Sequence, residues 1–100
     1  MAHYSIADII AYEAEGIFSK VVLKDKALNV SLFCMAAGTD IGVHTSTKEG
    51  TVFIIEGEGT FTLGDEPIAM NPGVLIHMKA DQPHSILVIK DTSFLLTLIN

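Results

Sequence analysis

The sequence predicts a small all-β protein, and three observations support this. Short apolar stretches recur at close and even spacing, turns of glycine, proline and polar residues separate them, and almost no stretch has a helical period. Eight or so such segments in series are typical of an antiparallel sandwich or barrel. One hundred residues make one domain with a small core, so we expect a single domain over residues 1–100.

The beginning of the chain differs from the rest, and we expect residues 1–15 to form an arm outside a barrel that spans residues 16–100. Ser5 and Asp8 have the spacing of a helix N-cap, in which side-chain oxygens satisfy the first free amides. A short helix or turn is therefore predicted over residues 5–11.

Strands are predicted where β-branched and aromatic residues gather between turn residues. The expected strands are residues 17–24, 28–36, 52–56, 59–63, 68–70, 74–78, 85–90 and 94–99. The first two are joined by a polar turn and are expected to form a hairpin, whereas residues 38–42 are expected to be a loop. Pro67 lacks an amide proton, so it can stand only at a strand start or at a sheet edge.

Charge and length exclude some classes of partner. Six basic residues stand against twelve acidic ones, which gives a net charge of −6, and no lysine or arginine cluster occurs, so nucleic acid is not an expected partner. No apolar run approaches the roughly 20 residues of a membrane span, and the N-terminus lacks a charged leader before an apolar core. We expect a cytoplasmic protein without a membrane partner, in which Cys34 is a buried apolar side chain.

The chain is more apolar than a monomer of this size readily covers. Apolar residues make up 49% of it, and the mean hydropathy is +0.45. The excess indicates a dimer interface, a lined cavity, or both. We expect a homodimer, with the N-terminal arm and residues 17–23 as candidates for the interface.

Residues 38–59 contain the clearest motif of the chain. Gly38, His44 and Gly57 have the spacing of G-x5-H-x-H-x3,4-E-x6-G. This pattern resembles the first motif of the cupin family, in which two histidines and a glutamate hold a metal inside a small β-barrel. Two of the family's ligands are replaced here, because the second histidine falls on Ser46 and the glutamate falls on Gly50.

Residues 73–84 are similar to the second cupin motif, G-x5-P-x4-H. Gly73 and His84 fit, while Lys79 occupies the proline position and Pro83 precedes the histidine. The resemblance implies a small antiparallel double-stranded β-helix, or jelly-roll barrel. It also implies that His44 and His84 come together from distant strands.

The candidate ligand-binding residues are His44, Ser46, His77 and His84, and the candidate metal ligands are His44 and His84. A divalent transition metal, Fe, Mn, Ni or Zn, would need further donors from water, from substrate, or from Ser46, Glu49 or His77. Alternatively, the two histidines are polar groups that line the barrel, or they act as acid and base. His77 shares a strand face with Leu75, and the sequence leaves its direction open, whereas Glu49 is expected to face solvent.

Three functions remain open at this point. The first is binding of an unknown small molecule in the barrel lumen, with or without a divalent metal. The second is a metal-dependent enzyme of the dioxygenase or isomerase type that uses His44 and His84 as ligands. The third is a non-catalytic structural or interaction module.

Overall fold

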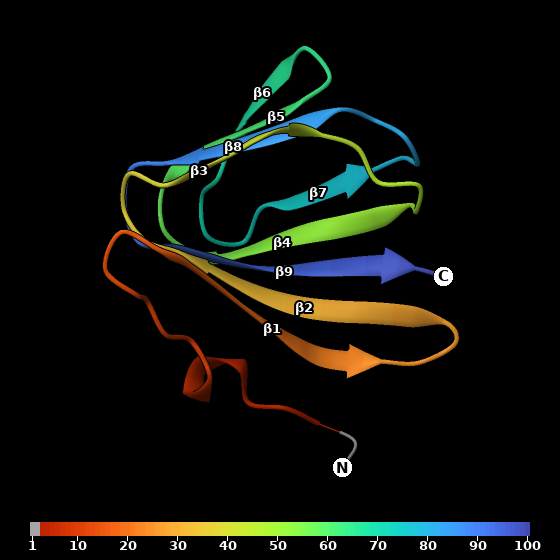
Figure 1. Cartoon of the computed structure of the whole chain (residues 1–100), viewed down its shortest axis with the longest axis horizontal. Helices are drawn as coiled ribbons and strands as arrows, with labels where there is room; N and C mark the ends of the chain where they lie inside the picture. The colour runs from red at the N-terminus through yellow and green to blue at the C-terminus, as the bar shows by residue number, and fades with distance from the viewer. Residues whose placement is uncertain (1–2) are drawn as a thin grey trace.

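Two antiparallel sheets pack face to face in the computed structural model, which describes residues 3–100 (Figure 1). Within these residues there are nine strands: β1 Ile17–Lys24, β2 Leu28–Met35, β3 Asp40–His44, β4 Gly50–Glu56, β5 Gly59–Leu63, β6 Glu66–Ala69, β7 Leu75–Met78, β8 His84–Val88 and β9 Thr92–Ile99. The strand order is β1-β2-β9-β4-β7 in one sheet and β3-β8-β5-β6 in the other. The predicted all-β barrel is confirmed.

The predicted strands are all present, and their ends agree to within two residues. The exception is β3, which the sequence predicted as a loop. Gly42 lies in its middle, and its pairing with β8 shifts register between Ile41 and His44. This segment is a strand because β8 supplies its hydrogen-bond partners, which a local sequence pattern does not reveal.

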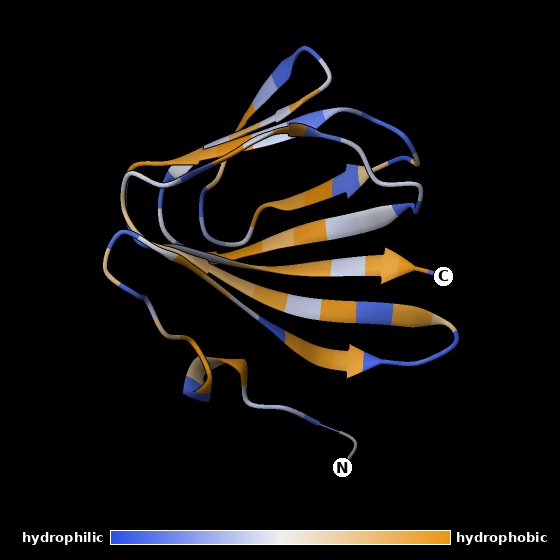
Figure 2. Ribbon diagram, viewed as in Figure 1, coloured by the Kyte–Doolittle hydropathy of each residue, from blue (hydrophilic) through white to orange (hydrophobic). Residues whose placement is uncertain are grey.

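Apolar side chains fill most of the space between the two sheets. Figure 2 shows hydrophobic residues along the strands and hydrophilic residues in the turns. The buried cluster consists of Met35, Val52, Ile54, Phe61, Met70, Ile76, Met78, Ile86, Val88 and Phe94. Each side chain of this kind contributes roughly 1.5–3 kcal/mol when it is fully buried. The interior is therefore a packed core over most of its length.

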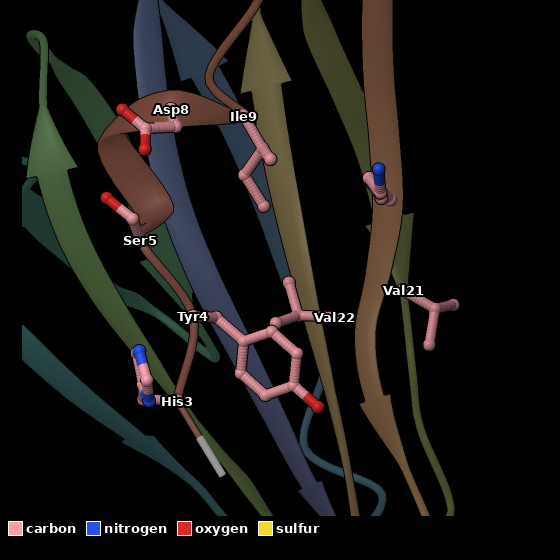
Figure 3. Close-up of a pocket in the computed structure, with 8 residues that line it drawn as sticks. His3, Tyr4, Ser5, Asp8, Ile9, Val21 and Val22 are labelled. Carbon is pink, nitrogen blue, oxygen red and sulfur yellow. The ribbon is translucent and has the colours of Figure 1, made fainter. Parts of the chain in front are cut away.

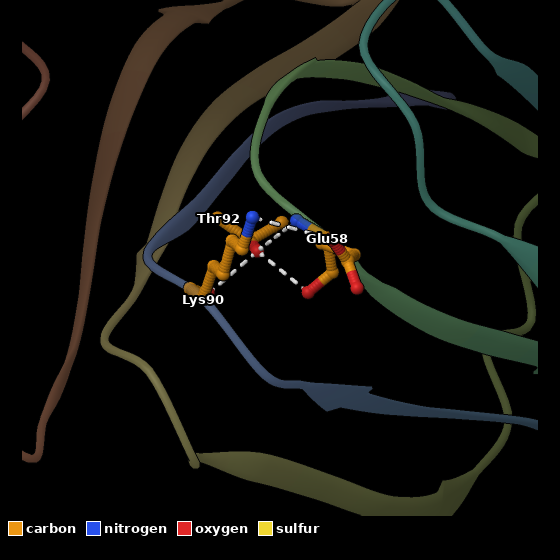
Figure 4. A network of polar contacts seen from close by, with 3 residues as sticks. All are labelled: Glu58, Lys90 and Thr92. Atoms are coloured by element: carbon orange, nitrogen blue, oxygen red, sulfur yellow. Dashed lines mark hydrogen bonds and ion pairs between the residues drawn. The ribbon is translucent and has the colours of Figure 1, made fainter.

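A polar network connects Glu58, Lys90 and Thr92 (Figure 4). Thr92 accepts a hydrogen bond from the amide of Glu58 at 3.1 Å and donates one to the carbonyl of Lys90 at 2.8 Å. Gly57 makes this approach possible, because a Cβ at this position would lie 2.2 Å from Oγ1 of Thr92. The network ties the β4–β5 turn to the β8–β9 turn.

The N-terminal arm covers part of the outer face of the five-stranded sheet. Leu32 and Cys34 point away from the core, yet both are fully buried, and the Cys34 thiol lies against the backbone of Ala11. Burial raises the pKa of this thiol. The arm contains one turn of 3₁₀ helix, Ile6–Asp8, which is shorter than predicted, and Ser5 makes no side-chain capping bond. No helix in the described part of the chain is long and apolar enough to cross a membrane.

Candidate functional site: a histidine pair at the open end of the barrel

β3 ends and β8 begins at the end of the barrel where the two sheets spread apart (Figure 1). His44 ends β3, His84 begins β8, and the two residues are directly paired in register. Their ring centroids are 4.0 Å apart, with 63° between the ring planes. His84 is 7% exposed, whereas His44 is exposed to solvent. The pair thus has one buried and one accessible member.

A β-bulge turns His44 toward the interior. Ile41 packs against the core, and a side chain three positions further along a regular strand would point to the opposite face. In this structure Ile41 pairs with Ile86 and His44 pairs with His84. The chain therefore advances by three residues on β3 while it advances by two on β8. The additional residue restores the inward direction.

Both rings are held by backbone carbonyl groups. Nδ1 of His44 lies 2.8 Å from the carbonyl oxygen of Gly42, and Nδ1 of His84 lies 2.9 Å from that of Gln82. A carbonyl oxygen only accepts hydrogen bonds, so each Nδ1 must carry the proton. When the rings are neutral, each Nε2 therefore has a lone pair available for a ligand.

The surroundings of His84 favour its neutral form. Burial lowers the pKa of His84, the neighbouring His44 lowers it further, and the bond to the Gln82 carbonyl opposes both effects. Phe61 stacks on the His84 ring, with centroids 5.7 Å apart and 4° between the planes. His84 is thus a fixed and uncharged acceptor at neutral pH.

The opposite sheet is apolar where β4 begins, at the same end of the barrel as the end of β3 (Figure 1). Gly50 is buried on the inner face of β4, and its register partners are Met78 and Leu98. A Cβ at position 50 would lie 2.4 Å from the carbonyl oxygen of Thr97 and 2.8 Å from Cδ2 of Leu98. Position 50 is where the cupin motif has its glutamate, and the structure has no room for that side chain.

The donor set does not fit a metal ion held by the protein alone. Among residues 3–100 no group of three or more histidine, cysteine, aspartate or glutamate side chains is placed to hold an ion. Ser46 is half-buried, and its hydroxyl accepts a hydrogen bond from the amide of Lys48 at 3.1 Å. Two imidazoles fall short of the three protein ligands of a catalytic zinc site and the four of a structural one.

His77 lies on the outer face of β7, apart from the histidine pair. Its neighbours Ile76 and Met78 belong to the core, so His77 points away from it. Its Nε2 lies 2.5 Å from Oε2 of Glu49, and both side chains are about half exposed. Of the four predicted ligand-binding residues, the structure brings His44 and His84 into contact and places His77 on the outer face.

Sequence reasoning missed several groups that build the site. Gly42 supplies both the bulge and the carbonyl for His44, Gln82 supplies the carbonyl for His84, and Phe61 supports its ring. A glycine two residues before a candidate ligand on a strand is the one signal that indicates such a bulge.

Two surface hollows are lined by residues other than the two histidines. One, of about 420 Å³, is between the arm and β1, where Tyr4, Ile9 and Val22 line it (Figure 3). Another, of about 440 Å³, is on the outer face of the four-stranded sheet beside Thr60 and Thr62. Neither is lined by His44 or His84.

A family model described as the cupin domain matches residues 31–100. The chain belongs to the cupin family. A search among curated proteins gave no significant match. The range of the family match includes His44, His84 and Gly50, so the altered ligand set lies within a cupin domain.

Solved cupin structures share the fold of this cupin. An RmlC-like cupin from Desulfovibrio desulfuricans is 22% identical, with a TM-score of 0.87 over 99% of this chain and 96% of that one. A cupin superfamily protein from Desulfitobacterium hafniense is 20% identical, with a TM-score of 0.87 over 94% of this chain and 86% of that one. The DMSP lyase DddQ from Ruegeria pomeroyi is 20% identical, with a TM-score of 0.78 over 84% of this chain and 47% of that one. At these identities the likeness shows the fold alone.

Proposed function

We propose that this cupin binds a small organic molecule at the open end of its barrel, with Nε2 of His44 and of His84 as the polar anchors. The observation that carries the proposal is the pair of Nδ1–carbonyl contacts, 2.8 and 2.9 Å long, which leave both Nε2 atoms as acceptors. A few placed polar groups beside apolar side chains are what small-molecule sites have in common.

The chemistry of the site selects the class of ligand. Two neutral imidazoles accept hydrogen bonds through Nε2, so they favour a ligand that donates a hydroxyl or an N–H proton. The residues around the pair are apolar. Phe61 stacks on the His84 ring, and Leu63 is the register partner of His84. On the opposite sheet, Met78 and Leu98 flank Gly50. The ligand is therefore a molecule with an apolar body and at least one donor group. A carboxylate, which only accepts, is disfavoured.

Metal-dependent catalysis is the second candidate function, and one observation favours it. Metal-bound histidines typically donate their second ring N–H to a carbonyl or carboxylate, as both histidines do here. The missing third ligand argues against it, because Gly50 leaves no space for a carboxylate. The lyase among the structural neighbours shows that a cupin fold can host an enzyme, at an identity that transfers no reaction.

Phenol is a suitable probe of the proposed site, and anisole is its matched control. Both have one aromatic ring, but anisole lacks the O–H donor. With ¹⁵N-labelled histidine, we expect phenol to shift the Nε2 resonances of His44 and His84, and anisole to leave them in place. The variant His84→Phe should lose the response, while His77→Phe should keep it because His77 lies on the outer face. Equal responses to phenol and anisole would contradict the proposal.

Metal analysis separates the two candidate functions. Protein purified without a histidine tag should contain no stoichiometric Fe, Mn, Ni or Zn, and added Zn²⁺ should bind weakly. One tightly held ion per chain, lost in both His44→Ala and His84→Ala, would establish the metal-centre alternative in place of the proposed one. In that case ion occupancy should fall as the pH drops through the histidine range, because protons compete for the same nitrogens.

A further inference from the structure

The hollow of about 420 Å³ between the N-terminal arm and β1 has an apolar lining from both of its walls (Figure 3). Tyr4 and Ile9 belong to the arm, and Val22 belongs to β1. Figure 3 shows these three side chains gathered at the centre of the view. The pairing of β1 with β2 shifts register at Val22, and such an irregularity bends a strand locally. The hollow thus forms where β1 departs from a regular strand.

Opposite charges line the two walls of this hollow. Asp8 is on the arm, in the short 3₁₀ helix, and Lys20 is on β1. Lys20 is the register partner of Leu32, so its side chain leaves β1 on the outer face, which the arm covers. Among residues 3–100, neither Asp8 nor Lys20 forms an ion pair. In this part of the chain, the anion of one wall and the cation of the other are both available to a ligand.

We propose that this hollow binds a small zwitterion in which an apolar body separates an ammonium group from a carboxylate group. The carboxylate of Asp8 accepts hydrogen bonds from the ammonium group of the ligand, and Lys20 donates them to its carboxylate group. Ser5 also lines the hollow and makes no side-chain capping bond, so its hydroxyl is a further partner for the ligand. The apolar body of the ligand lies against Ile9 and Val22.

The size of the hollow suits such a ligand. Small-molecule pockets have volumes of about 300–1,000 Å³ and combine apolar walls with a few polar groups. The volume of about 420 Å³ lies within this range, and the lining has both kinds of group. Neither His44 nor His84 lines the hollow, so this site is separate from the one proposed for the histidine pair.

Charge complementarity selects a zwitterion over a simple ion. The net charge of the chain is −6, so a simple anion is repelled by the protein as a whole and by Asp8 in the hollow itself. A simple cation is repelled by Lys20. Because Asp8 and Lys20 stand on opposite walls and do not pair, the two charges of the ligand must also be separated, as they are at the two ends of an ω-amino acid.

The probe for this site is ε-aminocaproate, and caproate, hexylamine and free glycine are its matched controls. Caproate lacks the ammonium group, hexylamine lacks the carboxylate group, and glycine lacks the apolar body. In an NMR titration of the ¹⁵N-labelled full chain, we expect ε-aminocaproate to shift the backbone amide resonances of Ile9 and Val22 to saturation. None of the three controls should produce the same shifts at the same concentration.

Two variants test the two charges separately. Asp8→Asn and Lys20→Gln should each weaken the binding of ε-aminocaproate about fivefold, because an ion pair between exposed groups contributes modestly. The matched control is Lys24→Gln, which removes a positive charge from the same strand outside the hollow. This control should bind ε-aminocaproate as the wild type does.

Three results would overturn the proposal. The first is the absence of saturable shifts at Ile9 and Val22 with ε-aminocaproate, and the second is equal binding of caproate or hexylamine. The third is an unchanged affinity in a folded Asp8→Asn or Lys20→Gln variant, or an equal loss of affinity in Lys24→Gln. The comparison of the four probes uses only the wild type, so it decides the proposal even where a variant fails to fold.

Discussion

Replacing Gly50 by alanine tests whether the wall opposite the histidines is as tight as the structure indicates. The new Cβ would lie 2.4 Å from the carbonyl oxygen of Thr97 and 2.8 Å from Cδ2 of Leu98. The oxygen belongs to the central strand β9, so it cannot rotate away as the end of a side chain would. Either β4 or β9 must shift by the better part of an ångström to relieve the contact.

The expected cost of Gly50→Ala follows from two opposing effects. Overpacking a well-filled core costs about 1–3 kcal/mol. Alanine also lowers the conformational entropy of the unfolded chain, which raises the free energy of unfolding by about 0.4–1 kcal/mol. We expect a net loss of about 1–2 kcal/mol in the free energy of unfolding, or roughly 5–15 °C in Tm for a domain of this size.

The control for this prediction is Gly42→Ala. Gly42 has a backbone conformation that other residues also adopt, and a Cβ at this position would have no other atom within 4 Å. The Gly42→Ala variant should therefore be as stable as the wild type or slightly more stable. Thermal unfolding followed by circular dichroism at neutral pH measures both variants. If the Tm of Gly50→Ala lies within about 2 °C of the wild-type value, the wall has room for a side chain, and the argument against a carboxylate at position 50 fails.

Three further predictions concern other groups. Burial lowers the pKa of His84, so the stability that its neutral form contributes should be complete above about pH 6.5 and should be lost as the pH falls through the lower folded pKa. In urea unfolding, the free energies of the wild type and of His84→Phe should therefore depend differently on pH in this window. Parallel pH profiles of the two proteins would contradict this prediction. Burial raises the pKa of Tyr12 to about 12, so ultraviolet titration should show a tyrosine that ionises well above pH 10, and stability should fall between about pH 10 and 12 in the wild type but not in Tyr12→Phe. In Gly57→Ala, a residue with a φ of +119° would carry a Cβ 2.2 Å from the buried hydroxyl of Thr92, so this variant should lose about 3 kcal/mol in the free energy of unfolding. Gly64→Ala also has a positive φ but open space around its Cβ, and it should lose only about 1 kcal/mol. Equal losses in thermal unfolding would refute this prediction.

The strands were predictable because their signal is local. Alternation in Gly59–Leu63 places Phe61 in the core and leaves Thr60 and Thr62 outside, as the period of two requires. Pro67 lies on the edge strand β6, where its missing amide proton costs nothing. β3 was missed because its glycine and aspartate disfavour a strand locally, and only the pairing with β8 makes it one.

The site was only partly predictable, because its features depend on contacts between distant strands. The spacing of the family motifs indicated that His44 and His84 belong together, and their rings are 4.0 Å apart. The direction of His77 was open because both Leu75 and Ile76 are apolar, so alternation could not identify the inward face. The tautomer of each histidine depends on the carbonyl it meets, which no spacing rule supplies.

The altered ligand set limits what the two remaining histidines can do. In a metal centre, a carboxylate opposite the histidines offsets the charge of the ion and completes its coordination. Here the matching position is Gly50, and the space that a side chain would need is occupied by the Thr97 carbonyl and by Leu98. A single substitution to glutamate therefore cannot restore the ligand without displacing β9. What remains is a pair of imidazoles whose Nδ1 atoms are held by backbone carbonyl groups. If the pair binds a ligand as we propose, its free Nε2 atoms should select that ligand by the protons it donates and not by the charge it carries.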